Sequence, residues 1–77
     1  MNKSIFYHAG CPVCVGAEQE IINLLGEESL HIVHLGENKQ EITAAEKFGV
    51  TSVPALVTPN GAVLHINYGA SLEDVKA

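Results

Sequence analysis

Two cysteines, Cys11 and Cys14, stand three positions apart near the start of the chain. Residues 4–7 form an apolar run typical of a strand, Gly10 ends it, and helix-type periodicity then continues to Leu25. Both sulfurs are therefore expected at a helix N-terminus, where unpaired backbone N–H groups and the positive end of the helix dipole favour a thiolate. A thiolate is the nucleophile of thiol–disulfide exchange, which is the chemistry that this spacing predicts.

The same pair could instead hold a metal or a partner. Two cysteines form at most one internal disulfide, so the chain is not a disulfide-stapled scaffold. Zinc prefers four ligands, whereas Cys11, Cys14 and His8 supply at most three from this turn. We therefore predict no metal and no other cofactor. The alternative is a thiol-based metal- or partner-binding module without turnover.

Length and composition narrow the class further. The chain has 77 residues, enough for a single domain spanning residues 1–77, and 47% of them are hydrophobic. A net charge of −5, with four Lys and no Arg, provides no basic patch for nucleic acid. No apolar run approaches the roughly 20 residues that span a bilayer, so no membrane partner is expected. The first residues lead into a strand without a long apolar leader, and we expect a cytoplasmic protein.

The first half of the chain predicts a strand, a helix, a second strand and a second helix. Residues 3–8 should form a strand covered on both faces, and residues 30–35 another, with its histidines His31 and His34 at the surface or edge. Asn38 has the spacing of an N-cap for a helix over residues 39–48. The residues expected to be buried on the two helices are Cys14, Ala17, Ile21, Ile22, Leu24 and Leu25 on the first and Ile42, Ala45 and Phe48 on the second, with Gly26 and Gly49 as C-caps.

The second half predicts a hairpin and a last helix. Pro59-Asn60-Gly61 is a strong hairpin signal, so residues 55–58 and 62–67 should pair antiparallel, with the ladder broken at residues 68–70. Ser71 and Asp74 have capping-box spacing for a final helix. The predicted order is β-α-β-α-β-β-α, an α/β fold in which the first two strands are parallel.

This order resembles the thioredoxin and glutaredoxin superfamily in its smallest form. The resemblance is carried by Cys11-Pro12-Val13-Cys14 at the first strand-to-helix turn, by residues 48–54 ending in Val53-Pro54, and by the hairpin with the glycine after it, Gly69. It implies a minimal thioredoxin-like fold, with a mixed four-stranded sheet flanked by helices. It also implies a thiol–disulfide oxidoreductase that acts on a disulfide-containing protein or small molecule and is served by a reductase or thiol donor.

The resemblance also assigns roles to residues. Cys11 would attack the target disulfide and the buried Cys14 would resolve the mixed disulfide. Pro54 would be cis and lie against the sulfurs, with the backbone of Val53 free to pair with an extended substrate. Pro12, Val13 and Gly69 would complete the substrate-binding surface. His8 could favour the Cys11 thiolate when protonated, or could simply be solvated at its strand end.

The chain departs from its relatives at several positions. Ile5 stands where thioredoxins usually carry a buried Asp that assists proton transfer, and Gly10 replaces the Trp before the first cysteine. The absence of Arg and the sequence Gly69-Ala70-Ser71-Leu72 do not match the glutathione-binding groups of glutaredoxins. These departures leave the subfamily open.

The last helix is shorter than is usual in the superfamily. Six residues follow Ser71, fewer than two helical turns, whereas relatives use a longer helix to cover a sheet face. Apolar surface should therefore remain exposed, and we predict a homodimer that covers it.

Overall fold

Strand β1 (Ser4–His8) lies inside a four-stranded sheet with the order β2-β1-β3-β4. In the computed structural model, which describes residues 3–76, β1 pairs in parallel with β2 (Leu30–His34) and antiparallel with β3 (Ser52–Val57), and β3 pairs antiparallel with β4 (Val63–Ser71). The consecutive apolar residues of β1 are covered on both faces, as predicted, since Phe6 is 0% and Tyr7 2% exposed. The mixed α/β sheet confirms the expected fold class.

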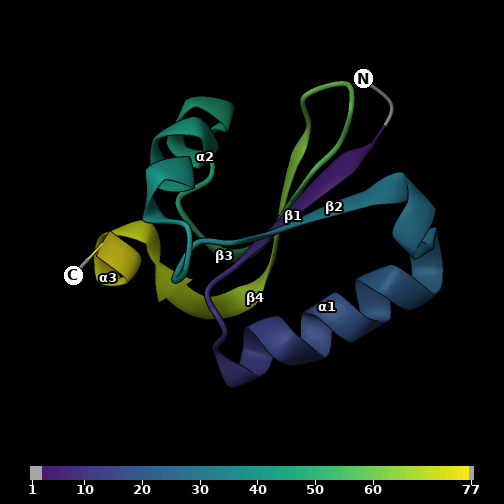
Figure 1. The fold of residues 1–77 in the computed structure, drawn as a ribbon, viewed down its shortest axis with the longest axis horizontal. Helices are drawn as coiled ribbons and strands as arrows, with labels where there is room; N and C mark the ends of the chain where they lie inside the picture. The colour runs from purple at the N-terminus through teal and green to yellow at the C-terminus, as the bar shows by residue number, and fades with distance from the viewer. Residues whose placement is uncertain (1–2, 77) are drawn as a thin grey trace.

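The helices divide between the two faces of the sheet (Figure 1). Helix α1 (Pro12–Leu25) covers one face, which we call the open face. Helices α2 (Ile42–Phe48) and α3 (Leu72–Lys76) lie on the other, which we call the closed face. The buried residues of the open-face core are Phe6, Ala17, Leu30 and Leu56, and those that α2, α3 and β2 bring to the closed face are Val33, Ile42, Ala45, Leu72 and Val75.

Helix α1 begins where the sequence predicts. Cys11 is its N-cap and Pro12 occupies the first turn, where a missing N–H is tolerated. The far end differs from the prediction, because Leu24 is 79% and Leu25 41% exposed. Apolar periodicity marks side chains that could be buried, but in residues 3–76 no second helix lies beside α1 on this face to cover them. Gly26 has the positive φ of 82° that glycine permits, with ψ at 147° rather than in the left-handed helical region.

The predicted second helix is only partly α-helical. It starts with the 3₁₀ turn η2 (Lys39–Glu41), and a second such turn, η1 (Glu27–Ser29), precedes β2. Asn38 does not cap the helix with its side chain, because its amide donates back to the His34 carbonyl at 3.4 Å. Phe48, expected in the core, is 47% exposed at the last position of α2.

The hairpin strands extend beyond their predicted bounds. β3 begins at Ser52 and includes Pro54, and β4 continues to Ser71. The register changes from Ala55 opposite His65 to Val53 opposite Ala70, so the predicted break near residues 68–70 is an interruption after which pairing resumes. The Ser71 hydroxyl accepts from the Asp74 N–H at 3.1 Å and the Asp74 carboxylate accepts from the Ser71 N–H at 3.4 Å, which confirms the predicted capping box.

Candidate redox site

Cys11 and Cys14 form a disulfide at the start of α1. The Cys14 N–H donates to the Cys11 Sγ at 3.1 Å, so the sulfur takes the place of the oxygen that an N-cap side chain usually offers. Cys14 is fully buried, whereas Cys11 is half-buried. The pair therefore has one sulfur open to a substrate and one sheltered behind it, at a helix end that favours negative charge.

Gly69 in β4 lies directly against the sulfurs. A Cβ at this position would collide with the Cys11 Sγ and would lie 3.0 Å from the Val53 carbonyl oxygen and 3.5 Å from the Cys14 Sγ. The two sulfurs of the CxxC turn and the Val53 carbonyl oxygen of β3 thus converge on a position that only glycine leaves open.

The first residues of β3 contribute their backbone to the site. Val53 and Pro54 are buried, and the peptide bond between them is cis. The last pair between β1 and β3 is Tyr7 with Ala55. The residues of β3 that precede Ala55 pair with β4, where Val53 lies opposite Ala70. The Val53 carbonyl oxygen and both sulfurs lie close to Gly69, so this carbonyl and the cis bond that follows it lie beside the disulfide.

The two residues between the cysteines differ in exposure. Pro12 is exposed at the first turn, and Val13 is half-buried. On the other side of Cys11 is a separate hollow of about 390 Å³, which we call the Cys11 hollow. Its lining comes from the turn between β1 and α1, from the segment after β2, from the end of β4 and from α3: Ala9, Gly10, Cys11, Gly36, Lys39, Ala70, Asp74 and Val75.

His8 is not the solvated strand-end residue that the sequence allowed, since it is 6% exposed. Its Nδ1 accepts a hydrogen bond from the Gly10 N–H at 3.3 Å, and its ring stacks on Phe6. Burial lowers the pKa of His8; Glu18 and Glu37 oppose this shift and His34 adds to it. A neutral His8 that fixes the turn before Cys11 fits this environment better than a cation that stabilises the thiolate.

His34 is a site neighbour that sequence reasoning missed. It lies on the edge strand β2, as predicted, but it is half-buried, with its ring centroid 4.5 Å from that of His8. Its Nδ1 is buried without a hydrogen-bond partner among residues 3–76. A Cβ on Gly10 or on Gly36 would come within 2.9 Å of this ring, so His34 occupies a notch between two glycines. The signal was present, because each histidine ends its strand and parallel pairing sets His8 beside His34. His31 and His65 are exposed, as predicted.

Two other observations concern the residues that the structure describes. Among residues 3–76, no three His, Cys, Asp or Glu side chains are grouped so that they could hold a metal ion. No helix in the same range is long and apolar enough to cross a membrane.

Comparison with known proteins identifies the family. No protein-family model matches the chain, and no curated protein matches it. Among solved structures, it is similar to a dimeric thioredoxin-like protein from Nitrosomonas europea determined by solution NMR. The two sequences are 56% identical over 97% of this chain and 95% of the other, and the folds superpose with a TM-score of 0.86. A mixed sheet with a CxxC pair at the start of its first helix is the thioredoxin type of architecture. The chain belongs to the thioredoxin-like proteins.

Proposed function

We propose that this protein is a thiol–disulfide oxidoreductase acting in the cytoplasm. The observation that carries the proposal is the Cys pair at the N-terminus of α1, with the Cys14 N–H directed at the half-buried Cys11 sulfur. In the reduced protein the same N–H and the helix dipole would stabilise a Cys11 thiolate. The membership of the family supports a redox role for the pair.

The exchange proceeds in two displacements. The Cys11 thiolate attacks one sulfur of the target disulfide, a Cys11–substrate disulfide forms, and the other substrate sulfur leaves as a thiolate that takes up a proton. Cys14, after losing its proton, attacks the Cys11 sulfur, the Cys11–Cys14 disulfide forms, and the second substrate thiol is released. The substrate gains two electrons, and a reductase or thiol donor returns two electrons to the protein.

The surroundings of Cys11 suggest how the substrate is held. Gly69 keeps one side of the sulfur free of side-chain bulk, and the Val53 carbonyl beside it offers an acceptor to an extended substrate backbone. Pro54 supports that carbonyl, while Pro12 and Val13 flank the sulfur on the helix side. In this proposal the Cys11 hollow receives the substrate residues next to the disulfide.

Serine variants of the two cysteines test the proposal. Cys11→Ser removes the nucleophile and should abolish exchange with a model disulfide. Cys14→Ser keeps the nucleophile but cannot resolve it, so a covalent protein–substrate adduct should accumulate and be visible by mass spectrometry without reductant. The proposal fails if Cys11→Ser retains exchange or if Cys14→Ser forms no adduct.

We also propose that the chain forms a homodimer. The similar protein from Nitrosomonas europea is described as dimeric, and the identity of 56% extends over nearly the whole of both chains. The exposed apolar side chains of this chain, Leu24 above all, support the same assembly here. Light scattering should give the mass of two chains.

A further inference from the structure

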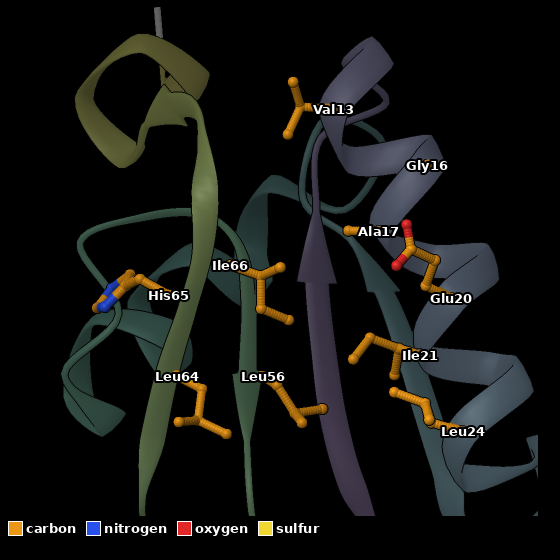
Figure 2. A pocket seen from close by; sticks show the side chains of 10 residues that line it. All are labelled: Val13, Gly16, Ala17, Glu20, Ile21, Leu24, Leu56, Leu64, His65 and Ile66. Atoms are coloured by element: carbon orange, nitrogen blue, oxygen red, sulfur yellow. The ribbon is translucent and has the colours of Figure 1, made fainter.

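An apolar groove runs along the open face between α1 and β4 (Figure 2). We call it the open-face groove; its volume is about 760 Å³. Figure 2 shows aliphatic side chains directed into it from both walls, and His65 pointing away from it. The main apolar groups are Ala17, Ile21 and Leu24 from α1 and Leu56, Leu64 and Ile66 from the strands.

The groove is open because the last helix lies elsewhere. The five residues of α3 pack on the closed face, where Leu72 and Val75 join the core with Ile42 and Ala45. On the open face, Leu24 stays 79% and Leu64 52% exposed. When another apolar surface covers these exposed side chains, their removal from water lowers the free energy.

We propose that the open-face groove is the interface between two copies of this chain, an inference that rests on the homodimer proposed above. The groove is self-complementary, because it offers both a hollow and a projecting apolar side chain, Leu24, at its rim. In a twofold dimer the Leu24 side chain of each copy enters the groove of the other copy, so both apolar surfaces are buried together.

The charge of the groove lining is compatible with a second copy. Two chains of net charge −5 repel each other, so their contact must be a surface with few carboxylates. Among the described residues that line the groove, one carboxylate is present, that of Glu20 on the α1 wall. A basic partner would find little in this lining to pair with, whereas an identical apolar surface matches it.

The position of the groove has a consequence for the redox site. Its upper end is formed by Val13, between the two cysteines, so a second copy would lie against the helix side of the CxxC turn. The Cys11 hollow, lined by Gly10 and Gly36, is a separate cavity and stays free. The dimer therefore leaves Cys11 accessible to a substrate from the Cys11 hollow.

The test compares charged substitutions on the two faces. Leu24→Glu and Leu64→Glu place a carboxylate in the proposed interface at exposed positions, so each monomer should still fold. Sedimentation equilibrium should give a dimer for the unchanged protein and a dissociation constant raised by roughly 30-fold or more in both variants. Phe48→Glu, at a 47% exposed position on the closed-face helix α2, is the matched control and should remain dimeric.

Each outcome is decisive. A dimer that persists in Leu24→Glu and Leu64→Glu, whether or not Phe48→Glu dissociates, places the interface elsewhere and overturns this inference while leaving the homodimer intact. A monomer at all concentrations overturns both the homodimer and its proposed interface. An apolar dye that binds this monomer but not its Leu24→Glu variant would then assign the groove to another partner. Disulfide exchange of the Leu24→Glu variant with dithiothreitol, measured in parallel, reports separately on the redox proposal.

Discussion

The two faces of the sheet are covered by unequal amounts of the chain. Within residues 3–76, the core cluster that includes α2 and α3 contains twelve buried residues, whereas the cluster under α1 contains four. The short helix α3 packs on the face with the larger core, where Leu72 and Val75 join the residues of α2. The open face is covered by α1, the helix that also carries the cysteines. The CxxC turn therefore lies beside the less buried part of the molecule.

The redox site joins the two faces. Cys14 lies on α1 but belongs to the core cluster of the closed face, together with Val53 and Tyr7. Cys11 packs against the same cluster from its edge. Cys14 is therefore held by the larger core cluster, and changes on the two faces should affect stability and exchange differently.

The largest difference should come from truncating one leucine on each face. Leu72→Ala removes a side chain that is 3% exposed in the closed-face core and should cost about 2–5 kcal/mol of unfolding free energy. Leu24→Ala, at a 79% exposed position, should stay within about 0.5 kcal/mol in the monomer. Urea unfolding at low protein concentration measures both. Equal costs would refute the distinction between the faces.

Gly69→Ala tests the contact between β4 and the disulfide. The added Cβ meets the Cys11 sulfur, so the disulfide or β4 must shift, and overpacking of this kind costs about 1–3 kcal/mol. We expect stability to fall within that range and exchange with a model disulfide to slow about tenfold. Gly16→Ala is the control, because nothing lies within 4 Å of its Cβ position. A Gly69→Ala protein as fast as the control would show that this close contact does not matter for exchange.

Loss of the cap on α3 should have a smaller effect on the closed face. Ser71→Ala removes the hydroxyl that accepts from the Asp74 N–H, and the loss of such a cap costs about 1 kcal/mol. Ser29→Ala, at an exposed position, serves as the comparison. If thermal unfolding shows the same small shift for both, the cap does not hold α3 in place.

The smallest effect should be a pH dependence from His8. Because burial lowers the pKa of His8 below its ordinary value of 6.5, the unfolded chain binds its proton first as the pH falls. The contribution of His8 to stability is therefore complete above pH 6.5 and is lost as the pH falls through the folded-state pKa. His8→Asn keeps an acceptor for the Gly10 N–H and should flatten this loss. His31→Asn, at an exposed position, should retain it, and identical profiles for the two variants would exclude His8 as the cause.

Local chemistry made most of the fold predictable. The Cys11–Cys14 spacing located the start of α1, and the Ser71–Asp74 spacing located that of α3. The errors share one cause, which is that a sequence pattern marks side chains able to be buried without showing what will cover them. Leu24 and Phe48 have the right periodicity, but no element of the described chain extends over them.

The parts of the site that depend on residues close together in the sequence were predictable. The cysteines were placed by their own motif, whereas the contact of Gly69 with both sulfurs depends on an interruption in strand pairing that no short pattern encodes. The place of His34 beside the site was missed because its ring lies between two glycines from separate loops. Contacts of this kind are determined by tertiary packing.

The most direct test of the redox proposal is the equilibrium of the Cys11–Cys14 pair in glutathione or dithiothreitol buffers of graded poise, read by thiol alkylation of metal-free protein. We predict a reversible two-electron transition between the dithiol and the internal disulfide, absent in Cys11→Ser. If no internal disulfide forms, or if the protein as purified holds stoichiometric metal on these sulfurs, the oxidoreductase proposal is wrong and the pair belongs to a binding module.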